Sequence, residues 1–78
     1  MIEQWGNTVS NYDTAIQMNV SFSNTNNYFV TASSVNENGR SYHMVVKVDT
    51  NHIKVYDMVF GDAWGVLSSQ MVWFATGY

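Results

Sequence analysis

The stretch SYHMVVKVD, residues 41–49, decides the fold class because its side chains alternate along the chain. Four apolar side chains share one face, namely Tyr42, Met44, Val46 and Val48. A period of two is that of a β-strand, whereas an amphipathic helix would space its apolar residues three or four apart. We therefore predict a strand over 41–49, with His43 on its outward face beside Lys47.

The residues on either side of this stretch predict hairpin connections to two more strands. Asn38-Gly39 precedes it, and Asn-Gly is the strongest short-range hairpin signal. The stretch before that signal, 28–35, is rich in aromatic and β-branched residues and predicts a strand. On the other side, the turn residues 50–52 lead into a predicted strand over 53–60.

Strands are also expected near both ends of the chain. Residues 14–23 alternate almost without a break, with apolar side chains at Ile16, Met18, Val20 and Phe22. The stretch 71–76 is apolar on both faces, as expected of a central or interface strand. A strand over 4–9 is weakly marked, and 62–70 has no clear period. The pattern predicts one all-β domain over residues 1–78, a small antiparallel β-sandwich of five to six strands.

The small size of the chain predicts association with copies of itself. A domain of this length buries only about 60% of the surface of its unfolded chain, so additional stabilisation is common. The sequence has no cysteine, and its two histidines, His43 and His52, fit no metal-ligand spacing. Oligomerisation is the remaining means of stabilisation, and we expect no cofactor and no metal.

The charge balance limits the classes of partner. Only 12% of the 78 residues are charged, with three Lys and Arg in all and a net charge of −3, which argues against nucleic acid and anionic membranes. No apolar run approaches 18 residues, so membrane insertion is not expected. Asn, Ser and Thr supply 23 of the 78 residues. Such a surface suits a neutral polar partner, such as a sugar or a protein, and it equally suits a packed oligomer.

Catalytic motifs are missing, so we do not expect an enzyme. There is no cysteine nucleophile and no Gly-x-Ser-x-Gly motif, and the aspartates are separated by strands and turns. A polysaccharide hydrolase would need two carboxyl groups about 5–9 Å apart, which the sequence does not establish.

The aromatic residues suggest a core, an interface and a ligand contact. Phe22, Phe29 and Phe60 are expected in the core. Trp73 and Phe74 face opposite sides of their strand, so one should fill the core and the other should meet a partner subunit or a ligand. Trp64 beside Asp62 suits stacking on a sugar, with Asn51 and His52 as further contacts from a neighbouring turn. A loop tryptophan folded back over the core is the alternative for Trp64.

Four short motifs follow one another in a fixed order along the chain. They are Gln4-Trp5-Gly6, Val20-Ser21-Phe22-Ser23, Tyr28-Phe29-Val30 and Val72-Trp73-Phe74-Ala75-Thr76-Gly77-Tyr78. In this order they resemble the C-terminal domain of bacteriophage tail fibres, which opens with Trp-Gly and closes with an aromatic-Trp-aliphatic-Ala-x-Gly-Tyr strand. The pattern also looks related to the H-type lectins, trimeric six-stranded sandwiches that bind sugars like N-acetylgalactosamine. The chain departs from the fibre pattern in lacking proline and in carrying Ala63-Trp64-Gly65, so no ligand residue carries over.

The resemblance implies a homotrimer at the distal tip of a fibre on the virion, made in the bacterial cytoplasm, and we expect the chain to be a fragment of a longer fibre protein. Its partners would be copies of itself and a glycan or protein of the bacterial surface. On this interpretation Trp73, Phe74 and Tyr78 lie at the oligomer interface, and Asp62, Trp64, Asn51 and His52 contact the ligand. The rival hypothesis is a trimerisation or capping module that binds nothing.

Overall fold

Two antiparallel β-sheets, with no helix, make up the described part of the protein. The structure is a computed structural model that describes residues 1–10, 15–35, 41–59, 66–67 and 70–78. The first sheet has the strand order β1-β7-β3 and consists of β1 (Ile2–Val9), β7 (Gln70–Gly77) and β3 (Tyr28–Ser34). Strand β7 is therefore central, which agrees with the apolar residues on both of its faces.

The second sheet is built around the hairpin of β4 (Ser41–Lys47) and β5 (His52–Val59). The two-residue strands β2 (Ile16–Gln17) and β6 (Val66–Leu67) both pair with β5. The hairpin register sets Val45 opposite Val55 and His43 opposite Asp57. Directly opposite residues share a face of a sheet, so this register fixes which side chains of β4 point inward.

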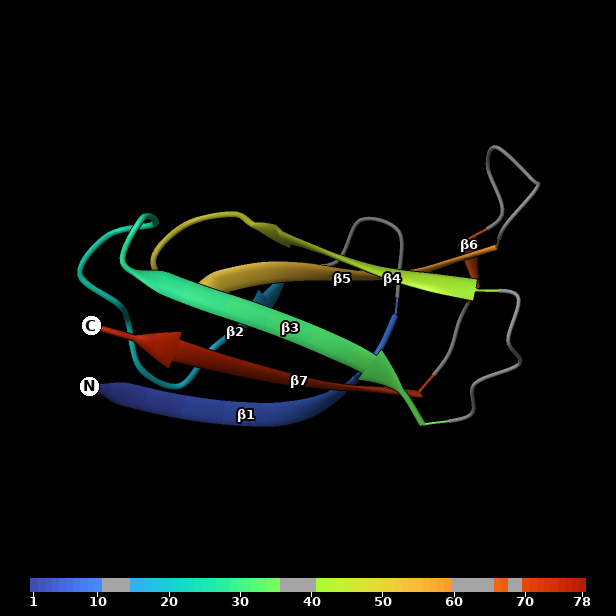
Figure 1. Ribbon diagram of the computed structural model, residues 1–78, viewed down its shortest axis with the longest axis horizontal. Coiled ribbons are helices and arrows are strands. Elements are labelled where there is room, and N and C mark those ends of the chain that lie inside the picture. The colour runs from blue at the N-terminus through green and yellow to red at the C-terminus, as the bar shows by residue number, and fades with distance from the viewer. Residues whose placement is uncertain (11–14, 36–40, 60–65, 68–69) are drawn as a thin grey trace.

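The core lies between the two sheets, which form the two layers visible in Figure 1. The first sheet contributes the alternate inward residues of β7 and Tyr28, and the second contributes Ile53 and Val55. The segment 18–22 adds Met18 and Phe22. The buried apolar set is Met18, Phe22, Tyr28, Ile53, Val55, Met71, Trp73 and Ala75.

The segment 18–23 is not a strand, so the predicted strand over 14–23 is too long. Only Ile16–Gln17 forms β2, and Thr14 lies outside the described residues. Instead of a ladder, the buried Gln4 amide fastens this segment to β1: its Nε2 donates to the Val20 carbonyl (2.7 Å) and its Oε1 accepts the Val20 N–H (3.0 Å). The alternation predicts the inward position of Met18 and Phe22 correctly, whereas Val20 is exposed.

The C-terminal residues are packed tightly against the start of β3. A Cβ placed on Gly77 would lie 2.1 Å from the Asn27 carbonyl oxygen and 2.6 Å from Tyr28 Cα, so only glycine fits. Tyr78 then donates its N–H to the Asn27 carbonyl (3.0 Å), and its own carbonyl accepts the Ser23 N–H (2.7 Å). Because Ile2 pairs with Gly77, the two chain ends lie side by side (Figure 1).

Tyr28 connects the two sheets at this end of the molecule. Its ring stacks on Phe22, with centroids 4.4 Å apart and planes 9° from parallel. Its hydroxyl donates to the Asp49 carbonyl (2.8 Å), and Lys47 Nζ lies 4.5 Å above the ring and donates to the Tyr28 carbonyl. Burial, together with the nearby Asp49 charge, raises the pKa of the Tyr28 hydroxyl, so it stays protonated and donating at neutral pH.

The sequence predictions of the fold are largely confirmed, with corrections in side-chain orientation. An antiparallel all-β chain is found, with strands within two residues of those expected over 4–9, 28–35, 41–49, 53–60 and 71–76. His43 was expected to point outward, but it lies on the inward face, 17% exposed, because the register pairs it with buried Asp57. Phe29 was expected in the core, but it is 65% exposed on the far face of β3. Phe60 lies outside the described residues.

Candidate functional site: an aromatic sheet face

The face of the β1-β7-β3 sheet that points away from the core, here called the outer face, carries exposed aromatic side chains. Trp5 of β1 is 68% exposed and Phe74 of β7 is 38% exposed. The two residues are direct partners in the β1–β7 ladder, so their side chains stand next to each other on this face. Phe29 and the C-terminal Tyr78 are further exposed aromatics at the same sheet. A monomer rarely leaves such a face bare without a functional reason.

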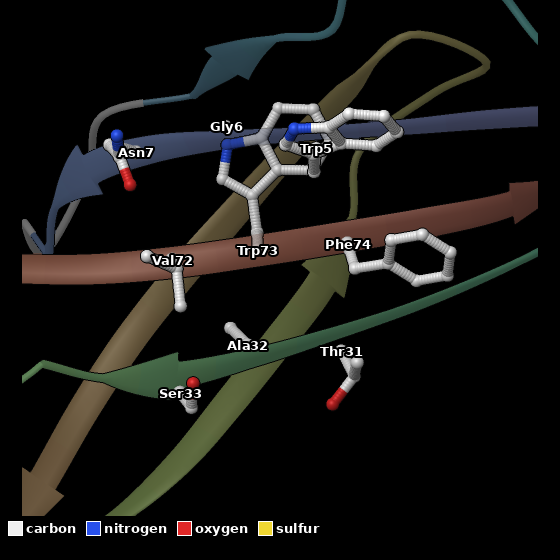
Figure 2. A pocket seen from close by; sticks show the side chains of 9 residues that line it. All are labelled: Trp5, Gly6, Asn7, Thr31, Ala32, Ser33, Val72, Trp73 and Phe74. Carbon is white, nitrogen blue, oxygen red and sulfur yellow. The ribbon is translucent and has the colours of Figure 1, made fainter.

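An open hollow of about 320 Å³, here called the central hollow, lies beside Trp5 and Phe74. Figure 2 shows its nine lining residues on three adjacent strands: Trp5, Gly6 and Asn7 on β1, Val72, Trp73 and Phe74 on β7, and Thr31, Ala32 and Ser33 on β3. Successive side chains of a strand alternate between faces, so the middle residue of each set contributes mainly backbone to the floor. The walls are then aromatic at one end and small or polar at the other.

Gly6 makes room under this floor for the indole of Trp73. The two residues are direct partners in the ladder, and a Cβ on Gly6 would lie 2.9 Å from three atoms of the Trp73 ring. Figure 2 shows the Trp73 side chain extending toward β1 at Gly6. The indole thereby packs on the glycine backbone, on the inward side, and is only 5% exposed. This contact fixes the position of β1, and with it Trp5, relative to β7.

The polar groups around the central hollow are neutral. Asn7 supplies an amide, and Thr31 and Ser33 supply hydroxyls; all three residues are exposed. None of the nine lining residues carries a charge. Amide and hydroxyl groups both donate and accept hydrogen bonds. The arrangement therefore suits a ligand with an apolar face and several uncharged hydrogen-bonding groups.

The predicted ligand residues of the loops are only partly described. Asp62 and Trp64 lie outside the described residues. Asn51 lies in the turn between β4 and β5, and His52, which was expected in this turn, is the first residue of β5. Asp49 maintains the geometry of the turn: its Oδ1 accepts the Asn51 N–H (2.9 Å) and is 2.9 Å from His52 Nδ1. The Asn51 carbonyl also accepts the N–H of Met18 (2.7 Å). A ligand role for Asn51 and His52 stays a prediction, alongside this contribution to the turn.

The Asp49 carboxylate predicts how the stability of the fold depends on pH. The hydrogen bond from the Asn51 N–H, followed by that from the His52 side chain, lowers the pKa of Asp49 below its ordinary value of 3.8. A carboxyl group whose pKa is depressed in the folded state stabilises the fold above its unfolded pKa, and this contribution is lost as the pH falls through the folded pKa. We expect Asp49→Asn to lower the melting temperature at pH 7, and the difference from wild type to shrink as the pH falls through the lowered pKa of Asp49, below its ordinary value of 3.8. A difference that persisted unchanged at low pH would contradict the role of the Asp49 charge.

The three residues predicted at an oligomer interface differ in their exposure. Phe74 and Tyr78 present surface to solvent, whereas Trp73 belongs to the core of the monomer itself. The prediction that one of these two neighbours points inward is confirmed: Trp73 is inside and Phe74 is outside. Whether Phe74 and Tyr78 contact a partner subunit stays a prediction.

A second apolar surface lies on the opposite side of the molecule. Strand β4 and the residue after it expose Tyr42, Met44, Val46 and Val48 on the face that points away from the core. Their ladder partners on β5 are Met58, Tyr56 and Lys54, all half-buried on the same face, so Lys54 adds one charged group to it. This surface, here called the β4–β5 face, contains the apolar stripe of residues 41–49.

An acidic side chain and a histidine, Asp57 and His43, approach each other between the two sheets. Buried Asp57, 2% exposed, has its Oδ1 3.8 Å from Nε2 of His43, but both groups lie between the sheets, away from a substrate in solvent. Within the described ranges, no three His, Cys, Asp or Glu residues gather closely enough to hold a metal ion. Nor do the described residues contain a helix long and apolar enough to cross a membrane.

Sequence reasoning did not select Trp5 as a site residue. The signal was present, because Trp5, Asn7 and Val9 alternate with Gln4, Gly6 and Thr8 along β1. The difficulty is that β1 places polar Gln4 inward and apolar Trp5 outward, the reverse of the usual pattern. Only the pairing with β7 shows that Trp5 and Phe74 stand together.

Comparison of the chain with protein-family models, with curated protein sequences and with solved structures found no match.

Proposed function

We propose that this chain is a non-enzymatic binding domain of a phage tail-fibre tip, which recognises a glycan of the bacterial host surface on its outer face. The observation that carries the proposal is the exposed pair Trp5 and Phe74 beside a hollow whose polar groups are all neutral. The fibre assignment is supported by the order of the sequence motifs, from Gln4-Trp5-Gly6 to the terminal Gly77-Tyr78.

The chemistry of a sugar fits this hollow. A pyranose has an apolar C–H face that packs on an aromatic ring, and a rim of hydroxyls that exchange hydrogen bonds with amides and hydroxyls. Trp5 offers the ring, and Asn7, Thr31 and Ser33 offer the polar groups. The volume of about 320 Å³ is at the lower end of ligand sites, which span about 300–1,000 Å³. One sugar unit is thus the natural occupant.

The proposed domain is a homotrimer, in line with its small size and lack of cysteine. The β4–β5 face supports self-association, because it is apolar and lies opposite the sugar-binding face. Three identical sites at one tip, and several fibres on one virion, would raise weak binding at each site through effective concentration.

The rival function is a purely structural trimerisation or capping module. It is favoured by the presence of two apolar faces, since copies of the chain could cover both of them. In that case Trp5 and Phe74 would be buried in the assembly, and no glycan would bind to them.

Replacement of Trp5 by alanine tests the proposal. We expect the variant to lose at least tenfold in affinity for its glycan, which corresponds to about 1.4 kcal/mol, because the stacking surface is removed. The measurement is a glycan array followed by titration of the glycan that gives the highest signal. Phe29→Ala is the matched control, since Phe29 is as exposed as Trp5 but does not line the central hollow.

The outcomes separate the two functions. Loss of binding by Trp5→Ala, with Phe29→Ala unchanged, supports glycan recognition at the central hollow. Equal binding by both variants would move the site elsewhere on the chain. Absence of binding by the parent protein, combined with a mass of three times 8.9 kDa in sedimentation, would favour the structural module.

A further inference from the structure

A second hollow, here called the edge hollow, lies on the other side of Trp5. Glu3, Gln4, Trp5, Asn19 and Val20 line it, and its volume is about 340 Å³. Trp5 is the residue that it shares with the central hollow. Strand β1 is an edge of its sheet, so the two hollows flank the Trp5 side chain, one toward the sheet centre and one toward the segment 18–23.

The wall of the edge hollow is held in place by Gln4. Its buried amide makes both hydrogen bonds to the Val20 backbone described above, which fix the segment with Asn19 against β1. Both ends of the amide are thereby engaged within the protein. The polar groups left to face a ligand are those of Glu3 and Asn19, which are both exposed. A wall fixed in this way reduces the entropy that is lost when a ligand binds.

We propose that the ligand is an oligosaccharide of at least two linked units, which crosses the edge of β1 at Trp5 with one unit in each hollow. This inference rests on the proposed glycan function and specifies its substrate class. Each hollow lies at the lower end of the size range of ligand sites, so each has room for a sugar unit. The exposed indole of Trp5 separates the units and offers surface to both.

The charged residues that line the two hollows define the class of sugar further. The central hollow has no charged lining residue, and the edge hollow has one, the carboxylate of Glu3. Neither lining contains a Lys or Arg that could pair with an acidic sugar, and the chain has a net charge of −3. Like charges brought together at an interface reduce affinity and give selectivity against the wrong ligand. The site therefore takes neutral or amino sugars and rejects uronic and sialic acids.

Titration with three forms of one glycan tests this inference. The probes are the array glycan of highest signal, its component monosaccharide, and the same glycan with one sugar oxidised at C6 to the uronate. We expect the monosaccharide to bind at least fivefold more weakly than the glycan, and the uronate form to bind at least threefold more weakly. Asn19→Ala should weaken the binding of the glycan at least threefold and that of the monosaccharide less, because only the glycan fills both hollows.

Glu3→Gln isolates the charge. We expect this variant to reduce the difference in affinity between the neutral glycan and its uronate form to less than twofold, because both forms then meet an uncharged amide. Glu3 and Asn19 are exposed, so both variants should fold, which circular dichroism checks. A monosaccharide that binds as tightly as the glycan, together with no effect of Asn19→Ala, would overturn the two-unit site while leaving the proposed function intact. A failure of the proposed function appears differently, as an array on which no glycan binds.

Discussion

Replacing Gly77 by alanine is expected to destabilise the fold more than the same change at Gly6, the other glycine among the described residues, where the close neighbours are side-chain atoms. The added Cβ would lie 2.1 Å from the Asn27 carbonyl oxygen and 2.6 Å from Tyr28 Cα. Both neighbours are backbone atoms, so no side-chain rotation relieves the overlap. Strand β7 would have to move away from β3, which breaks the hydrogen bond from Tyr78 to Asn27 and weakens the packing around Tyr28.

The expected cost exceeds about 3 kcal/mol, the upper range for overpacking a core. A domain of this size has a stability of about 4–12 kcal/mol, so the variant should lose about a quarter or more of its unfolding free energy. Urea unfolding followed by tryptophan fluorescence measures the change. Thr76→Ala is the control one residue earlier, at a half-buried position where the change removes atoms and adds none, and it should cost less than about 1 kcal/mol. A Gly77→Ala variant as stable as this control would show that the two strands are not so closely packed.

The structure explains why Gly77 is a glycine, and the sequence alone could not. A glycine before the last residue looks like a place where the chain turns or loosens. In the structure it is a buried strand position, where β7 passes directly over the Asn27 peptide. The sequence pattern located the strand to within one residue at each end, because alternation is a local property. The close approach depends on a residue fifty positions away, and no local pattern contains it.

The orientation of side chains was harder to predict than the strands themselves. The stretch 41–49 has apolar residues at Tyr42, Met44, Val46 and Val48, but the hairpin register turns this stripe to solvent and His43 inward. A strand with Val on both faces carries little information about which face is buried. The same ambiguity applies to β1, where Gln4 is buried because its amide bonds to Val20, and Trp5 is left exposed. The candidate site residue Trp5 was not selected from the sequence for this reason, since an exposed tryptophan is not the usual expectation.

Substitution of Trp73 and Phe74 one at a time should give opposite results, although the two residues are neighbours in β7. Trp73 is 5% exposed and packs on Gly6, so Trp73→Ala removes a large part of the core. We expect a loss of about 3–5 kcal/mol in unfolding free energy, the range for truncating a buried aromatic residue. The loss should be the same at low and high protein concentration, because the missing contacts lie within one chain.

Phe74→Ala changes the outer face and not the core. We expect the unfolding free energy to fall by less than about 1 kcal/mol, because the Phe74 side chain already contacts solvent. Glycan affinity should fall at least threefold, since Phe74 lines the central hollow next to Trp5.

Sedimentation of the Phe74→Ala variant decides between the two proposed functions. A trimer that persists, with weakened glycan binding, assigns the outer face to the ligand and leaves self-association to the β4–β5 face. A trimer that dissociates would instead place Phe74 between subunits, and the outer face would then be the surface that holds a fibre tip together.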